Sequence, residues 1–286
     1  MEKVEKKFSY RTAEHFAELS NLAYQEEKQF KKTASAMGYK NIKYFNIDGA
    51  QAYGMAKDDY IVLAFRGTEP TQFNDIKADL NALHVRNELG KGRVHKGFKR
   101  EVDDIWEQIE DWLAKRNWRQ AYTCGHSLGG AMSTIACSRL PEGTVCYNYG
   151  SPRVGTPGWV REFNSKFTLH RFVNNNDIVP RVPFAIMWYK HAGELFYIKT
   201  YGNIRNATLW QRLKDRFRGY WNAWKKRQWF DSIYDHAMPK YFNQMPKNFV
   251  YNLDAQKTHD TVVVTEGQFD ALQMGGVALA GNTPNS

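Results

Sequence analysis

Residues 119–131 read RQAYTCGHSLGGA, and this stretch decides the fold. A short apolar run meets a Gly-x-Ser-x-Gly turn, and a helix-prone run follows as far as Leu140. In such a strand–turn–helix unit the serine, here Ser127, sits on a strained turn at the carboxyl end of the strand. Glycines flank the turn because Cβ atoms there would collide with the crossing backbone. The stretch predicts an exposed nucleophile beside a helix N-terminus, whose N–H groups and dipole favour an oxyanion.

A glycine-rich turn whose serine only caps the helix is the alternative interpretation of the same Gly-x-Ser-x-Gly motif. The nucleophile interpretation therefore depends on a general base and an orienting carboxylate, which a serine hydroxyl needs before it attacks a carbonyl carbon. In folds that carry this turn, the acid and then the histidine follow the serine along the chain.

Asp177 and His236 satisfy this order. Asp177 follows an expected strand, at the carboxyl edge where sites gather in open α/β sheets; a turn aspartate before Ile-Val-Pro is the alternative. Both His191 and His236 come after Asp177, and the base is expected on the loop after the next strand. That position selects His236. We interpret His191 as a packing or hydrogen-bonding residue, and His259 as part of a weakly structured tail.

Two backbone N–H groups are expected to bind the oxyanion. One belongs to Leu128, the residue after the nucleophile. The second is expected on the loop after an early strand, where Thr68 follows Phe-Arg-Gly. The Thr68 hydroxyl adds a third donor in this interpretation.

Length and composition fit one large α/β domain or two small ones, because the chain has 286 residues, of which 42% are apolar. The net charge of +10 favours anionic partners such as a membrane surface, an acidic ligand or nucleic acid. No apolar run is long enough to span a membrane, and the first residues lack the apolar core of a signal peptide, which favours a cytoplasmic location slightly. The three cysteines are expected to be buried free thiols.

Apolar spacing predicts alternating strands and helices. Residues 8–37 carry helical spacing and end before Gly38. Further helices are expected around residues 74–83, over the amphipathic stretch 102–113, after the Ser127 turn and over residues 157–166. Strands are expected at residues 42–47, 51–55, 60–65, 144–149, 168–173 and 195–200, besides the one before Ser127. The alternation predicts an α/β fold: a largely parallel, doubly wound central sheet with helices on both faces.

A set of short stretches, taken together, resembles the class 3 lipase family, the α/β-hydrolases related to filamentous-fungal triacylglycerol lipases. They lie in the family's order and spacing over roughly residues 15–250. The stretches are Leu19–Tyr24, Ala64–Thr68, Ala78–Leu80, Val94–Phe98, Gly125–Ala131, Tyr149–Gly155, Asn176–Arg181, His191–Glu194 and Asp235–His236.

This resemblance implies an α/β-hydrolase fold with a triad of Ser127, Asp177 and His236 and an oxyanion hole at Thr68 and Leu128. The implied reaction is the hydrolysis of carboxylic esters of lipids, with no metal or other cofactor. The resemblance also implies a lid over the site, within residues 69–93. The sequence departs from the fungal lid there, because its lid segment is more polar and lacks the tryptophan before Asp-Leu.

An insertion over residues 203–231 separates the last expected strand from His236. Within residues 205–230, eight Lys or Arg side chains stand against a single acid, Asp215, and apolar residues recur at helical spacing. A basic helix with an aromatic face is typical of a membrane interface, although a face that covers the core gives the same pattern. We expect an anionic membrane surface as a partner and no nucleic acid. The hydrolase domain is expected over residues 1–253, followed by a C-terminal extension over residues 254–286.

The favoured interpretation is a serine hydrolase that cleaves lipid esters through an acyl-enzyme. One alternative keeps the fold and changes the substrate: a phospholipase A1 on anionic membranes, which the cationic segment suits. Another alternative is a catalytically idle module that binds membranes or nucleic acid. The intact set of predicted site residues argues against the idle module.

Overall fold

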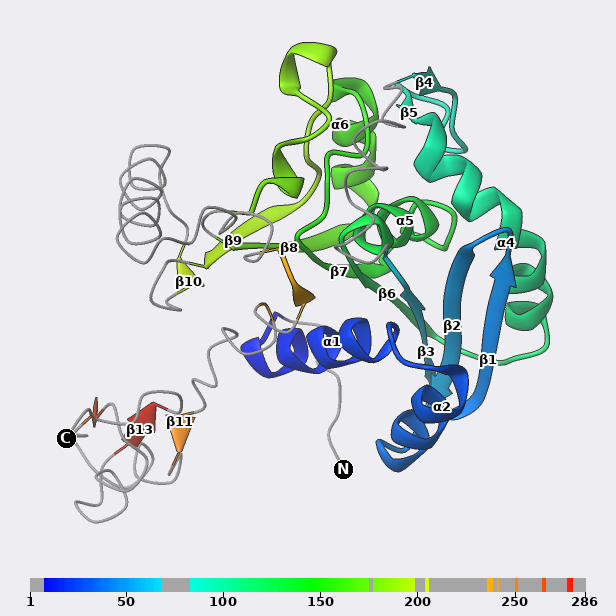
Figure 1. Ribbon diagram of the computed structural model, residues 1–286, viewed down its shortest axis with the longest axis vertical. Helices are drawn as coiled ribbons and strands as arrows, with labels where there is room; N and C mark the ends of the chain where they lie inside the picture. Colours follow the sequence, from blue (N-terminus) through cyan, green and yellow to red (C-terminus); the bar gives the residue numbers. More distant parts are fainter. Residues whose placement is uncertain are drawn as a thin grey trace.

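The centre of the fold is an eight-stranded sheet in the order β1-β2-β3-β6-β7-β8-β9-β10 (Figure 1). It belongs to a computed structural model that describes residues 8–67, 83–174, 177–198, 204–205, 236–238, 241, 250–251, 264–265 and 277–279. The strands of the sheet are β1 (Lys40–Ile47), β2 (Ala50–Lys57), β3 (Tyr60–Phe65), β6 (Gln120–His126), β7 (Val145–Tyr149), β8 (Thr168–Asn174), β9 (Glu194–Ile198) and β10 (Ile204–Arg205).

Most of this sheet is parallel. Strands β3, β6, β7, β8 and β9 run in one direction, whereas β1, β2 and β3 form an antiparallel meander and β10 pairs antiparallel with β9. Every residue of β3 is buried, as the continuous apolar run of that strand predicts. The expected largely parallel α/β sheet is therefore confirmed.

Helices cover both faces of the sheet, as expected. They are α1 (Tyr10–Leu22), α2 (Glu27–Ala36), α4 (Lys96–Ala114), α5 (Leu128–Cys137) and α6 (Pro157–Lys166). The last three connect successive parallel strands and pack in one core, while α1 and α2 pack in the core on the opposite face. The parallel strands follow one another without a reversal of order, so right-handed crossovers place all three connecting helices on one face. The doubly wound connection that we expected is therefore wrong.

The chain before β1 forms two helices instead of the continuous helical segment expected over residues 8–37. The first helix ends at Leu22, and backbone hydrogen bonds turn the chain through residues 23–25. The turn is needed because the two helices cover different strands. Helix α1 packs over β6 and β7, whereas α2 packs against β1, and its Phe30 ring stacks on Tyr53 of β2 with centroids 3.6 Å apart.

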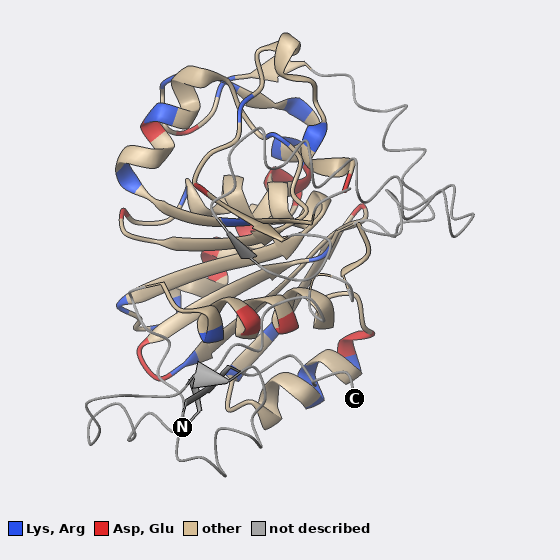
Figure 2. Ribbon diagram, turned by 90° about the vertical axis from the view of Figure 1, so that its left-hand side faces the viewer, with Lys and Arg blue, Asp and Glu red and all other residues tan. Residues whose placement is uncertain are grey.

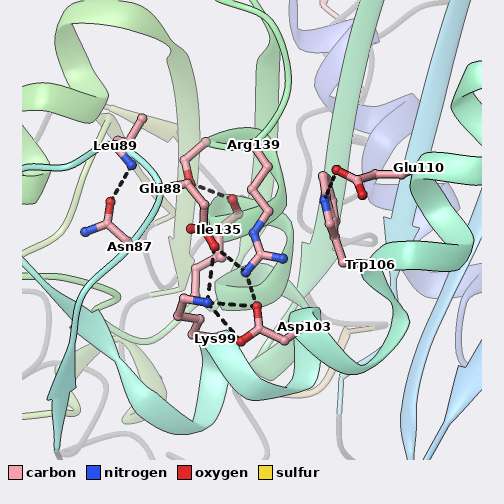
Figure 3. A network of polar contacts seen from close by, with 10 residues as sticks. Asn87, Glu88, Leu89, Lys99, Asp103, Trp106, Glu110, Ile135 and Arg139 are labelled. Atoms are coloured by element: carbon pink, nitrogen blue, oxygen red, sulfur yellow. Dashed lines mark hydrogen bonds and ion pairs between the residues drawn. The ribbon is translucent and has the colours of Figure 1, made fainter.

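A network of ion pairs fastens α4 to the end of α5 (Figure 3). Arg139 follows α5, its side chain is 5% exposed, and it binds Asp103 of α4 and, at 3.0 Å, Glu88. The ammonium group of Lys99 joins the same two carboxylates at 2.9 Å and 3.1 Å. The guanidinium of Arg139 also lies 5.0 Å from the ring centroid of Trp106. Because Glu88 belongs to the expected lid region, the network ties the described end of that region to the helical layer.

Two smaller groups of strands complete the described chain. β4 (His84–Val85) and β5 (Val94–His95) form a short antiparallel pair. β11 (Val250–Tyr251), β12 (Val264–Thr265) and β13 (Val277–Leu279) form a separate sheet in the order β11-β13-β12. The expected C-terminal extension therefore pairs with the residues just before it.

The composition also bears on the cysteines and on the apolar length of the helices. The three cysteines, Cys124, Cys137 and Cys146, are buried and free, as expected. Among the described residues, no helix is long and apolar enough to cross a membrane.

Candidate active site

Ser127 occupies the turn between β6 and α5. Its backbone has φ 58 and ψ −128, a conformation that costs a non-glycine residue about 1–3 kcal/mol. The turn closes tightly because a Cβ on Gly125 would collide with the carbonyl group of Gly129. A Cβ on Gly129 would in turn collide with the backbone of Phe65 and Arg66 at the end of β3. The predicted strained serine is therefore present at the carboxyl end of β6.

His236 and Asp177 meet Ser127 in a continuous chain of hydrogen bonds. His236 Nε2 lies 2.7 Å from Ser127 Oγ, and His236 Nδ1 lies 2.9 Å from Asp177 Oδ2. All three residues are buried. A carboxylate only accepts hydrogen bonds, so Nδ1–H donates to Asp177 and Nε2 is left to accept the serine proton. The structure thus brings together the three residues that the sequence order selected.

Two further donors hold the Asp177 carboxylate. Its Oδ1 accepts the backbone N–H of Val179 at 2.8 Å, and its Oδ2 accepts the Tyr241 hydroxyl at 2.5 Å. The Tyr241 oxygen itself accepts the backbone N–H of Asn174, the last residue of β8, at 2.9 Å. These bonds satisfy the buried carboxylate and fix its orientation toward His236.

A second histidine supports His236 from its backbone side. His126 Nε2 donates to the carbonyl oxygen of His236 at 2.6 Å, and because a carbonyl only accepts, the ring proton sits on Nε2. His126 Nδ1 therefore accepts the Tyr24 hydroxyl at 2.7 Å. The two imidazole rings stack with centroids 4.5 Å apart. Burial, and then the neighbouring His236, lower the pKa of His126 well below its ordinary value, so it is a neutral support.

Gly150 leaves room for the acid and the base at the end of β7. Its φ of +60 is a left-handed conformation that favours glycine. A Cβ at this position would lie 2.8 Å from Asp177 Oδ2 and 3.1 Å from the His236 ring. Any larger residue would therefore push the pair apart.

The expected oxyanion donors are only partly described. Leu128 is the first residue of α5, so its N–H has no partner within the helix. Thr68 lies outside the described residues. Gly67 lies against the nucleophile, because a Cβ on Gly67 would be 3.2 Å from the Cβ of Ser127. The end of β3 and the start of α5 therefore flank Ser127, and of the two expected donors only Leu128 lies among the described residues.

Other predicted features fall partly outside the described residues. The structure describes residues 83–93 of the expected lid region and only β10 of the insertion. The basic aromatic segment 205–230 therefore lies almost wholly outside the described residues. His191 donates from Nε2 to the carbonyl oxygen of Pro180 at 2.7 Å, in agreement with its predicted hydrogen-bonding role. The described part of the chain contains no cluster of three His, Cys, Asp or Glu residues that could hold a metal ion.

Sequence reasoning missed three supporting residues: Tyr241, His126 and Tyr24. Tyr24 lies inside one of the family-like stretches and His126 directly precedes Ser127, yet no spacing rule relates either residue to His236. Their contacts join positions 64, 110 and 102 residues apart. Such pairs become visible only when the sheet brings them to one edge.

Known proteins resemble this chain in sequence and in fold. Residues 62–187 match the family of class 3 lipases. Over these residues the chain is similar to the class 3 lipases. Among solved structures, one described as showing that a serine protease triad forms the catalytic centre of a triacylglycerol lipase aligns with a TM-score of 0.58 at 25% identity. The alignment covers 68% of this chain and 82% of that one, which confirms the α/β-hydrolase fold.

Two curated relatives widen the comparison. Toxin TseL of Vibrio cholerae is 29% identical over 207 residues, which cover 57% of this chain and 31% of the toxin. The secreted mono- and diacylglycerol lipase A of Penicillium cyclopium is 30% identical over 158 residues, which cover 52% of this chain and 51% of the lipase. The chain thus spans a third to a half of the length of these relatives.

The secreted fungal relative corrects one expectation. The slight preference for a cytoplasmic location is wrong. It rested on the N-terminal composition, whereas the similarity lies in the folded domain, and a shared α/β core is compatible with secretion.

Proposed function

We propose that this chain is a serine hydrolase that cleaves carboxylic esters of lipids. Ser127 is the nucleophile, His236 the general base and acid, and Asp177 the orienting carboxylate. The observation that carries the proposal is the buried chain of hydrogen bonds from Ser127 Oγ through His236 to Asp177, with distances of 2.7 Å and 2.9 Å. The lipase relatives support the lipid ester as the substrate class.

In the proposed reaction, His236 Nε2 takes the proton of Ser127 Oγ as the oxygen attacks the ester carbonyl carbon. The N–H groups of Leu128 and Thr68 bind the oxyanion that forms. When the tetrahedral intermediate collapses, His236 returns the proton to the leaving alcohol, and an acyl-enzyme remains. Water, deprotonated by the same nitrogen, then releases the fatty acid and restores Ser127.

Replacing the nucleophile tests this mechanism. We expect Ser127→Ala to lower the turnover of a soluble short-chain chromogenic ester by about 10⁴-fold or more. Ser133→Ala is the matched control, because Ser133 lies on the same helix and its hydroxyl bonds only within the helix and to Cys146. Retained turnover in Ser127→Ala, or equal loss in both variants, would contradict the assignment.

We propose acylglycerols rather than phospholipids as the substrates. The relatives named for their substrates are mono- and diacylglycerol or triacylglycerol lipases, which favours this class over the phospholipase A1 alternative. A panel of mono-, di- and triacylglycerols and anionic phospholipids, compared by fatty acid release, separates the two. Faster release from the phospholipid would favour the alternative.

We further propose that the hydrolase domain over residues 1–253 uses its insertion to contact an anionic membrane surface. The support is composition: eight cations and one acid over residues 205–230, with apolar residues at helical spacing. Co-sedimentation with anionic and neutral vesicles measures the contact, and equally weak binding to both would contradict it.

A further inference from the structure

The most exposed apolar side chains of the described residues lie together in one turn. Between β8 and β9, every residue from 184 to 188 is exposed. The large members are Phe184 at 61%, Ile186 at 88%, Met187 at 40% and Trp188 at 72% exposure. Elsewhere in the described chain, only Tyr10 and Leu83 are large apolar residues with comparable exposure. We call residues 184–188 the apolar tip.

Hydrogen bonds hold the chain on both sides of the apolar tip. The guanidinium of Arg153 donates to the carbonyl oxygen of Pro183 at 2.8 Å, and the backbone N–H of Arg153 donates to Val182 at the same distance. On the other side of the tip, the N–H of Lys190 donates to the carbonyl of Gly155, also at 2.8 Å. Because both ends are hydrogen-bonded to one segment, the exposure belongs to an ordered turn.

Trp188 adds a conformational argument. Its φ of 62 and ψ of 19 are left-handed, a region that bulky residues rarely adopt. Its side chain gains little burial within the chain in return. This conformation ends the short 3-10 turn Ala185–Met187, and its backbone hydrogen bond to Ala185 fixes the position from which the exposed tryptophan extends.

The position of the tip relates it to the candidate active site. Ser127 follows β6 and Asp177 follows β8, so both lie at the carboxyl edge of the parallel strands, and the tip follows Asp177 in the same connection. Figure 1 shows this connection, in lime green, rising to the top of the view. Figure 2 shows an uncharged turn at the top, with Lys and Arg in segments below it.

The charged residues nearest to the tip along the chain are cations on both sides, Arg181 before it and Lys190 after it. Between Asp177 and Glu194 the chain carries two cations, Arg181 and Lys190, and no acid. Cations beside an apolar insertion strengthen its attraction to anionic headgroups.

We propose that the apolar tip inserts into the surface of a lipid aggregate and turns the edge that carries Ser127 toward its substrate. The inference rests on the proposed hydrolysis of lipid esters. A few projecting side chains with an exposed tryptophan suit a lipid–water interface, where tryptophan is enriched. A stable protein partner requires roughly 800 Å² on each side, which one five-residue turn cannot supply.

A label at the tip tests insertion directly. Ile186→Cys can carry a polarity-sensitive thiol dye, because the native cysteines are buried. Tyr10→Cys is the matched control, since Tyr10 is exposed at the start of α1. Vesicles of ether-linked phosphatidylcholine, alone or mixed with ether-linked phosphatidylglycerol, contain no acyl ester to cleave.

We expect the emission of the dye at position 186 to shift to shorter wavelength with both vesicles and the emission at position 10 to stay unchanged. An unshifted emission at position 186, or the same shift at both positions, overturns the proposal.

A second variant separates insertion from chemistry. Ile186→Ser combined with Trp188→Asn removes the two most exposed apolar groups, and asparagine tolerates the left-handed backbone. We expect partition onto the vesicles to weaken about tenfold or more, while turnover of a soluble short-chain ester stays at the wild-type value. Partition equal to that of the wild type overturns the insertion. If the wild type does not hydrolyse the soluble ester, the proposed function is overturned instead. The two failures can be told apart, because partition onto the vesicles is measured in the absence of any cleavable ester.

Discussion

Tyr241 is the residue that joins the acid of the candidate triad to the central sheet. Its hydroxyl donates to Asp177 and accepts the N–H of Asn174, so one oxygen links the carboxylate to the end of β8. We interpret Tyr241 as a positioning residue, because it touches Asp177 and not the reacting serine. Precise placement of the acid matters, since it holds the imidazole in the tautomer that accepts the serine proton.

Tyr241→Phe should therefore lower kcat by about tenfold with little change in KM, because a hydrogen bond to a charged group contributes about 1.5–3 kcal/mol. Steady-state kinetics on a soluble ester measure both constants. Tyr149→Phe is the control: its buried hydroxyl donates to the carbonyl of Ala13 and not to the acid, so stability should fall and kcat should hold. Equal kcat values for Tyr241→Phe and the wild type would refute the positioning role.

Helix α5 lies so close to β3 that the backbones of the two elements are in direct contact. Gly129 makes this approach possible, since a Cβ there would collide with Phe65 and Arg66. The same approach sets the turn at Ser127 and the first N–H groups of the helix beside the end of β3. The geometry of the candidate site is thus a property of how two elements pack.

We expect Gly129→Ala to lower the free energy of unfolding by about 1–3 kcal/mol, as overpacked sites do, and to reduce ester turnover. Gly158→Ala offers a matched comparison, because Gly158 is also the second residue of a helix. Its Cβ would meet nothing closer than 3.4 Å, so stability should stay the same or rise by up to about 1 kcal/mol. Urea unfolding measures both changes, and similar values for the two variants would argue against the close approach.

Neutral histidines, some buried and some half-buried, occur in several elements of the described chain. Burial lowers the pKa of His15, His95 and His170 to about 4, and the pKa values of His126 and His191 lie well below the ordinary value. In the unfolded chain these groups titrate near pH 6.5. Between pH 6.5 and 4 the unfolded state therefore binds more protons than the folded state, so acid favours unfolding.

Above pH 6.5 these histidines should not change the free energy of unfolding. As the pH decreases from 6.5 toward 4, they should lower it. Each histidine that stays neutral contributes up to about 1.4 kcal/mol per pH unit. Urea titrations at several pH values give the slope. His170→Phe should flatten it, because His170 packs among the rings of Phe8, Tyr147 and Phe196. An unchanged slope in that variant would contradict the neutral state of His170.

The sequence by itself determined the features that depend on neighbouring residues. The glycines around Ser127 permit a strained turn because backbone sterics act over a few residues, and the buried strand β3 is visible because its apolar run is continuous. The order of serine, acid and histidine then sufficed to choose His236 over His191. These signals are local or sequential, and the residues that they select, Ser127, Asp177 and His236, lie in one chain of hydrogen bonds.

Only the tertiary structure decided which residues support the site and how the helices are distributed. Tyr241, His126 and Tyr24 act through contacts between distant positions, and the break before α2 depends on which strand each helix must cover. The three connecting helices lie on one face because of the strand order, and the apolar periodicity of the sequence does not encode that order. The physical reason is that periodicity and turn sterics fix elements one at a time, whereas partners across the sheet are fixed by packing of the whole chain.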